Sequence, residues 1–167
     1  MPPETDNLKL QGLYEADQQD RKQVFSTADM VALLHQRDSQ RRQTVLEMMS
    51  RGEVNTQQDL YHAAVIFLHG STPKDFLTCH RLAVMAAIKG HGPSRWLACA
   101  SLDRFLMAAG LAQVYGTQFE HNPEENKYQL RLPIEDNTLL SFEKKFFNVP
   151  SIADRLAQLN GRIQASK

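Results

Sequence analysis

Glycine and proline divide the middle of the chain into three helical stretches, and this division constrains the fold more than any other feature of the sequence. Two residues separate Gly70 from Pro73, and two separate Gly90 from Pro93. Glycine commonly ends helices, whereas proline suits their first turn. Turns this short join antiparallel neighbours. The sequence therefore predicts two consecutive helical hairpins, with the third helix ending near Gly110.

Helical periodicity also precedes this segment. Apolar residues recur at helical spacing from residue 8 onward and again in a stretch that ends at Arg51 and Gly52. Ser26 or Thr27 is a suitable cap for the start of that second stretch. Whether residues 37–43 interrupt it stays open. We expect a helical part over 8–110.

The periodicity changes after residue 110. Two β-prone runs within residues 113–133 predict a hairpin, which must pack on the helices because an isolated hairpin is marginal in water. A short helix is expected over 150–160, and the ends 1–7 and 162–167 are expected to be disordered. The length of 167 residues fits one domain. The predicted fold is mainly α, a compact bundle of antiparallel helical hairpins with one small β-hairpin near the C-terminus.

Composition narrows the classes of function and location. Nineteen basic and nineteen acidic residues give zero net charge, which argues against a nucleic-acid partner. The longest apolar stretches fall short of the ~20 residues that span a bilayer, and the N-terminus lacks a signal-peptide pattern, so no membrane partner is expected. Two cysteines, Cys79 and Cys99, form neither a disulfide framework nor a CxxC motif. We expect a cytoplasmic protein.

A carboxylate stands within the most apolar helix, which is predicted over 93–110. Asp103 shares a helical stripe with Trp96, Cys99 and Leu106, so it should point into packed structure. A buried carboxylate must be paired or hydrogen-bonded. It is either a structural group that bridges helices or, with the neighbouring Arg104, part of a functional site.

Register arithmetic brings two histidines to the height of Asp103. If the hairpins turn near residues 71–72 and 91–92, His80 lies opposite residue 103 and beside His62. Such a layer would form an acid–base cluster or a site with two histidines and one carboxylate for a metal. Alternatively, one histidine is a core residue and the other faces water. Metal and cofactor identities stay open.

The segment from Gln113 to Gln118 is the second candidate. Gly116 marks a bulge or a close approach to the backbone, and Tyr115 and Thr117 add hydrogen-bonding groups without a strong nucleophile. These groups suit ligand binding, although an ordinary hairpin strand explains them equally well.

A charged run near the N-terminus is the third candidate. The favoured interpretation is a solvated helix face, since surface pairs such as Asp17 with Arg21 contribute little; the run also contains Glu15, Gln18 and Asp20. Adjacent helical residues point about 100° apart, so Cys79 and His80 do not form a thiolate pair. No phosphate-binding glycine loop, HExxH, GxSxG or zinc-type Cys/His spacing occurs in the sequence.

A family resemblance rests on several of these segments. The block Arg95-Trp96-Leu97-Ala98 with Asp103-Arg104, followed by Gln113-Val114-Tyr115-Gly116-Thr117-Gln118, resembles an uncharacterised bacterial family of unknown function. The resemblance implies a bacterial origin and a set of polar positions, and no reaction. Typical members carry glutamine where this chain has Leu68, which argues against a polar site at His69. The helical hairpins are also loosely similar to tetratricopeptide units.

These observations lead to one main hypothesis and two alternatives. The main hypothesis is a pocket that binds a small polar molecule or a peptide, lined by His62, His80, Arg95, Asp103, Arg104, Gln113, Tyr115, Gly116, Thr117 and Gln118. The first alternative is an enzyme in which His62 or His80 is the general base, oriented by Asp103, with Arg104 as an anion clamp. The second is a protein-interaction module of the helical-repeat type. The oligomeric state stays open.

Overall fold

The computed structural model describes residues 5–23, 25–135 and 140–165. Within these ranges the chain is mainly α-helical with one small antiparallel β-hairpin, as predicted, and the helices number seven. In the same ranges, no helix combines the length and the apolar character needed to cross a membrane. Residues 1–4 and 166–167, at the ends that we expected to be disordered, lie outside the described ranges.

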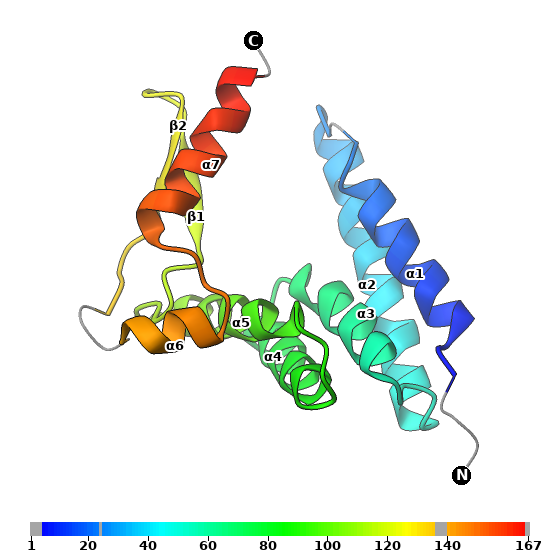
Figure 1. Cartoon of the computed structure of the whole chain (residues 1–167). Helices are drawn as coiled ribbons and strands as arrows, with labels where there is room; N and C mark the ends of the chain where they lie inside the picture. The colour runs from blue at the N-terminus through cyan, green and yellow to red at the C-terminus, as the bar shows by residue number, and fades with distance from the viewer. Residues whose placement is uncertain (1–4, 24, 136–139, 166–167) are drawn as a thin grey trace.

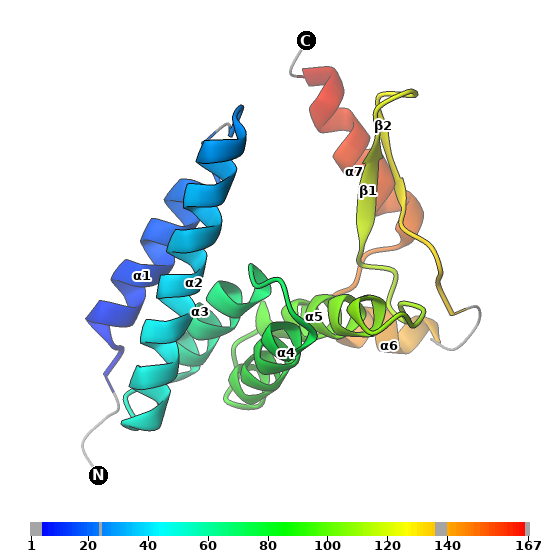
Figure 2. The same cartoon turned by 180° about the vertical axis from the view of Figure 1, so that it is seen from behind.

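The helices and strands follow one another along the chain as α1 (Leu8–Asp20), α2 (Ala28–Ser50), α3 (Gln57–Leu68), α4 (Pro73–Ile88), α5 (Ser94–Ala108), β1 (Phe119–Asn122), β2 (Lys127–Leu130), α6 (Ser141–Phe146) and α7 (Ile152–Ala165). Helices α1 and α2 lie side by side and pack with α3 on one flank of the molecule (Figures 1 and 2). Helices α4 and α5 form its centre. The hairpin and α7 pack together on the other flank.

Local capping explains where the helices begin. Thr27 caps α2, and Thr56 and Thr72 form capping boxes with Asp59 and Asp75 at the starts of α3 and α4. Pro73 occupies the first turn of α4, as predicted. Helix α2 runs without interruption through residues 37–43, which settles the question that the sequence left open.

The core lies where α3 meets its neighbours. Eight of the twelve residues of α3 are buried, and α4 faces this helix with small residues. Ala63 and Ala64 of α3 and Ala83 and Ala86 of α4 are all buried, which allows the two helices to approach closely. This packing holds the C-terminal end of α3 between α1 and α5.

The C-terminal part differs from the prediction in three ways. The strands are shorter than the β-prone runs. Residues 113–118 form a loop, in which Gln113 makes an isolated β-bridge with Ile134. Helix α6 was not predicted. Helix α7 continues past residues 160 and 161 to Ala165, because Asn160 does not end the helix and instead accepts a hydrogen bond from the Tyr128 N–H at 2.7 Å.

Gly70 is required at the turn between α3 and α4. A Cβ atom at this position would lie 2.3 Å from Cβ of Asp75, the capping-box residue of α4. We expect Gly70→Ala to lower the free energy of unfolding by about 1 to 3 kcal/mol, because the overpacked turn must shift. Urea denaturation measures the change. Gly12→Ala is the matched control: Gly12 lies within α1 with open space around it, so alanine should stabilise the protein, and a loss there equal to that of Gly70→Ala would contradict the steric explanation.

Candidate functional site

Asp103 lies in α5, fully buried, and binds the loop formed by residues 113–118. Its carboxylate accepts hydrogen bonds from the backbone N–H groups of Val114, Tyr115 and Thr117 at 2.8, 2.9 and 3.0 Å. The Thr117 hydroxyl donates a fourth bond at 2.7 Å. Four donors compensate for the removal of the carboxylate from water. Asp103 therefore fixes this loop against α5.

Gln113 connects the same loop to the segment that follows the hairpin. Its side chain is fully buried, and its Oε1 accepts a hydrogen bond from the Gln118 N–H at 2.9 Å. Its Nε2 donates to the carbonyl oxygens of Gln118 and Arg131. Both polar atoms of the Gln113 side chain are thus hydrogen-bonded to backbone groups. Gln113 holds the loop and does not face a ligand.

Gly116 makes the tight path of this loop possible. Its φ angle is +70°, and a Cβ atom would lie 3.2 Å from side-chain atoms of both Ile134 and Ile152. The expected close approach is therefore made by two apolar side chains of the protein itself. The neighbouring Tyr115 packs edge-on against Phe147, with 5.7 Å between ring centroids.

Arg104 and Gln118 form a polar pair beside this loop. Arg104 Nε donates to Gln118 Oε1 at 3.1 Å, and Arg104 Nη1 donates to the carbonyl oxygen of Leu68 at 3.0 Å. Gln118 Nε2 donates in turn to the Ala100 carbonyl at 3.1 Å and to the Thr117 hydroxyl at 2.9 Å. The guanidinium is thereby fixed at the junction of α3 and α5.

The charge of Arg104 has no carboxylate within ion-pair distance among the residues that the structure describes. Burial lowers the pKa of its guanidinium, and the charges of Arg131 and Arg21 act in the same direction. Arg131 and Arg21 are therefore close enough to Arg104 for their charges to oppose its own. Perturbed charges of this kind occur preferentially at functional sites.

Two adjacent pockets share Arg104, Gln118 and Phe119 in their walls. One, of about 280 Å³, also contains Arg131. The other, of about 180 Å³, is also lined by Arg155, Trp96 and Tyr128. No described aspartate or glutamate lines either pocket, although acidic and basic residues are equal in number in the chain. Both pockets are consequently positive and partly aromatic.

The expected layer of His62, His80 and Asp103 does not form a joint site. His62 stacks on Tyr14, with 4.2 Å between ring centroids, and burial lowers its pKa. The Nδ1 atom of His80 lies 2.9 Å from the Ala98 carbonyl and ties α4 to α5. No three His, Cys, Asp or Glu side chains of the described chain are arranged to hold a metal ion. The described residues therefore do not form the metal triad that the register arithmetic left open, because equal height does not make side chains face one another.

Arg95 also lies apart from the pockets of Arg104. Its guanidinium stands 5.4 Å from the ring centroid of Phe146, and Nη1 is 3.5 Å from the carbonyl oxygen of the same residue. These contacts attach α5 to α6. The two cysteines are buried free thiols, and burial raises the pKa of each to about 12, which agrees with rejecting Cys79 as a nucleophile.

The charged run of α1 is not a solvated face, so the favoured interpretation was wrong for its two aspartates. Asp17 and Asp20 are 1 % and 6 % exposed and meet buried charges of α2. Arg41 binds Asp20, and it binds Asp38 at 2.7 Å. Arg21 bridges Asp17 at 3.2 Å and Asp38 at 2.7 Å. We call these five residues, with Arg37, the α1–α2 ion network.

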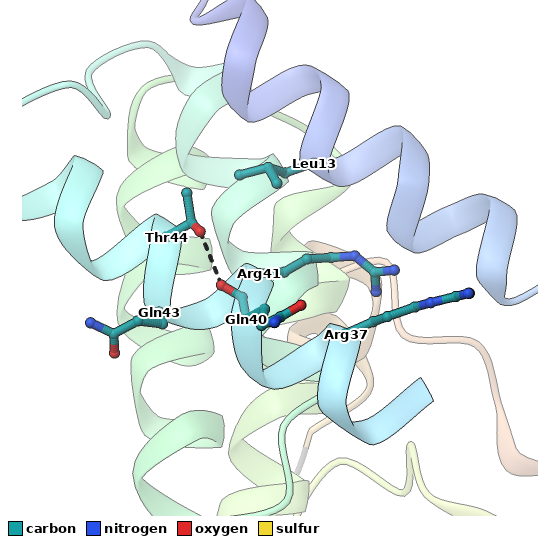
Figure 3. A pocket seen from close by; sticks show the side chains of 6 residues that line it. All are labelled: Leu13, Arg37, Gln40, Arg41, Gln43 and Thr44. Atoms are coloured by element: carbon teal, nitrogen blue, oxygen red, sulfur yellow. Dashed lines mark hydrogen bonds between the residues drawn. The ribbon is translucent and has the colours of Figure 1, made fainter. Parts of the chain in front are cut away.

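A third pocket, of about 540 Å³, lies over this network (Figure 3). Leu13 of α1 faces α2 there, and Arg37 and Arg41 extend from α2 toward α1, whereas Gln43 points away. Both arginines already bind Asp20. Although this pocket is larger than the two beside Arg104, its cations are neutralised. It is a poorer anion site for that reason.

His69, at the C-terminal end of α3, extends the ion network to a third helix. Its Nδ1 lies 2.9 Å from both carboxylate oxygens of Asp17, so His69 has a polar partner although Leu68 argued against a polar site here. Burial alone raises the pKa of Asp17, but the hydrogen bond and charge of His69, together with Arg21, outweigh burial and lower it. Asp17 is therefore ionised near neutral pH.

Sequence reasoning missed His69, the burial of the ion network, and four pocket residues, Trp96, Tyr128, Arg131 and Arg155. One signal was present. Acidic and basic residues recur at spacings of three and four on two successive helices, Asp17, Asp20 and Arg21 on the first, and Asp38 and Arg41 on the second. Stripes of this kind also occur on solvated helices, so they show that charges could pair without identifying the partner helix.

Comparison with protein-family models, with curated proteins and with solved structures gave no match to this chain, so the function has to be inferred from the site itself.

Proposed function

We propose that the protein binds a small anionic molecule in the pockets beside Arg104. The observation that carries this proposal is the lack of a carboxylate partner for Arg104 among the described residues, within pocket walls that contain no described acid. A partly buried cation is costly unless it is compensated. A bound carboxylate or phosphate group would supply the missing negative charge.

The geometry also supports a ligand that is small and partly aromatic or apolar. Arginine binds planar or tetrahedral oxyanions through several N–H groups at once. Two of the N–H directions of Arg104 are taken by Gln118 and Leu68, which orient the group. Trp96 and Tyr128 are aromatic residues that line the smaller pocket. A peptide ligand is less well supported, because both pockets are small, at about 280 and 180 Å³.

Inorganic phosphate is a suitable probe for this proposal. We expect isothermal titration calorimetry at low salt to show saturable binding to the wild type, with acetate bound more weakly because it carries less charge. Arg104→Met should weaken phosphate binding at least tenfold, which corresponds to about 1.4 kcal/mol. Arg81→Met, at an exposed position of α4, is the matched control and should bind like the wild type.

Two results would contradict the proposal. One is the absence of saturable phosphate binding to the folded wild type. The other is equal binding by Arg104→Met and Arg81→Met, which would assign any affinity to general surface charge. Circular dichroism of both variants ensures that a loss of binding is not a loss of fold.

A cytoplasmic location and a bacterial origin belong to the same proposal. The two buried free thiols support a reducing compartment. The bacterial origin rests on the resemblance of the WLA, DR and QVYGTQ segments alone. A helical-repeat interaction module is less well supported, because Asp103 and Gln113 serve the internal packing of a single loop.

A further inference from the structure

The two pockets beside Arg104 differ in the chemistry of their walls. Both include Arg104 in a shared wall. Beyond that wall, the larger pocket contains a second arginine, Arg131, whereas the smaller one contains two aromatic residues with polar ring groups, Trp96 and Tyr128. A single ligand that fills both pockets therefore has an anionic end and an aromatic end.

The larger pocket is the better of the two for a phosphate group. Burial lowers the pKa of Arg104, and the nearby charge of Arg131 lowers it further. The guanidinium of Arg131 has no ion-pair or hydrogen-bond partner among the described residues, whereas that of Arg155, in the smaller pocket, already donates to Gln158. Two guanidinium groups that lack acids can share one phosphate, which accepts several N–H bonds at once.

The smaller pocket suits an aromatic ring that carries hydrogen-bonding atoms. Asn160 of α7 fixes the backbone of Tyr128, accepting from its N–H at 2.7 Å and donating to its carbonyl oxygen at 3.3 Å. Trp96 packs against the core. The indole N–H of Trp96 and the hydroxyl of Tyr128 have no hydrogen-bond partner among the described residues. A heteroaromatic ring can pack on such side chains and also bind their polar groups.

The shared wall indicates that a spacer joins the two ends of the ligand. Gln118 and Phe119 stand in this wall together with Arg104. A ring bonded directly to a phosphate fits one pocket, whereas a sugar between them lets each end reach its own. Ligand sites commonly begin at about 300 Å³. The pockets, of about 280 and 180 Å³, reach this size only together.

We propose that this site binds a nucleoside monophosphate, with the phosphate in the pocket of Arg104 and Arg131 and the base in the pocket of Trp96 and Tyr128. This inference rests on the proposed anion binding and names the class of ligand. The sugar crosses the shared wall. Binding of the base to aromatic side chains adds affinity that inorganic phosphate alone does not have.

Calorimetry at low salt compares ribose 5-phosphate with the 5′-monophosphates of adenosine, guanosine, cytidine and uridine, using the full chain. At least one nucleotide should bind ten times more tightly than ribose 5-phosphate. Tyr128→Leu should weaken that nucleotide at least fivefold and leave ribose 5-phosphate within about twofold, whereas Arg131→Met should weaken both. Phe142→Leu, at an exposed position of α6 outside both pockets, is the matched control and should bind like the wild type.

Fluorescence places the base directly, because Trp96 is the only tryptophan of the chain. The nucleotide should quench its emission saturably, and ribose 5-phosphate should not. The assignment is overturned if no nucleotide binds more tightly than ribose 5-phosphate, if the nucleoside without phosphate binds as tightly as its nucleotide, or if Tyr128→Leu and Phe142→Leu behave alike. In those cases anion binding can still stand. A wild type that binds neither inorganic phosphate nor ribose 5-phosphate overturns the proposed function itself.

Discussion

Replacing Asp103 by alanine is expected to lower the free energy of unfolding by about 4 kcal/mol. The carboxylate accepts four hydrogen bonds from the loop of residues 113–118, and its side chain is fully buried. Each buried donor left without a partner costs about 1 to 3 kcal/mol, and partial entry of water reduces the sum. Urea denaturation followed by circular dichroism measures the loss.

The same variant should also lose phosphate binding. The loop carries Thr117 and Gln118, and Gln118 orients the guanidinium of Arg104. When Asp103 no longer holds the loop, Gln118 and Arg104 lose their fixed positions in the walls of the two pockets. Asp103→Asn should lie between the alanine variant and the wild type, because the amide oxygen still accepts while its NH₂ group opposes the remaining donors.

Asp29→Ala is the matched control for this prediction. Asp29 is also a helical aspartate, but it is exposed in the first turn of α2. Its removal should cost only a few tenths of a kcal/mol through the helix dipole. If Asp103→Ala were no more harmful than Asp29→Ala, the four hydrogen bonds would not be what holds the loop.

The helices were predictable because their limits are set by neighbouring residues. Thr56 with Asp59, and Thr72 with Asp75, satisfy the first N–H groups of α3 and α4 within one turn of chain. The burial of Asp103 was predictable for a similar reason, since its stripe on α5 is apolar. Capping and periodicity depend on residues three or four positions apart, so a single sequence is enough to predict them.

The loop and the ion network depend on contacts between distant parts of the chain. Residues 113–118 have a β-prone composition, but Asp103 takes the N–H groups that a neighbouring strand would otherwise bind. A charged stripe on α1 looks alike whether water or a charged helix faces it. Asp38 and Arg41 complete that stripe from α2, and His69 completes it from α3. Periodicity alone does not say which helix faces which.

The ion network makes Arg41 the residue of α2 with the largest expected effect on stability. Its side chain is 8 % exposed and contacts Asp20 and Asp38, with Asp17 at 3.7 Å. Arg41→Met keeps most of the apolar volume but leaves three buried carboxylates to share Arg21 and Arg37. We expect the free energy of unfolding to fall by about 3 to 5 kcal/mol, because unpaired charges remain in the interior.

The comparison with Arg51→Met tests whether burial is the cause. Arg51 also pairs with a carboxylate, that of Glu53 at 2.6 Å, but both side chains are exposed. Surface pairs contribute little to stability, so this variant should keep the wild-type urea midpoint. The double variant of Arg41→Met with Asp20→Asn should recover part of the free energy of unfolding that Arg41→Met loses, because the unpaired charge of Asp20 is gone. If the double variant were as unstable as the two single losses added together, Arg41 and Asp20 would not be coupled, and the buried network would not be what joins α1 to α2.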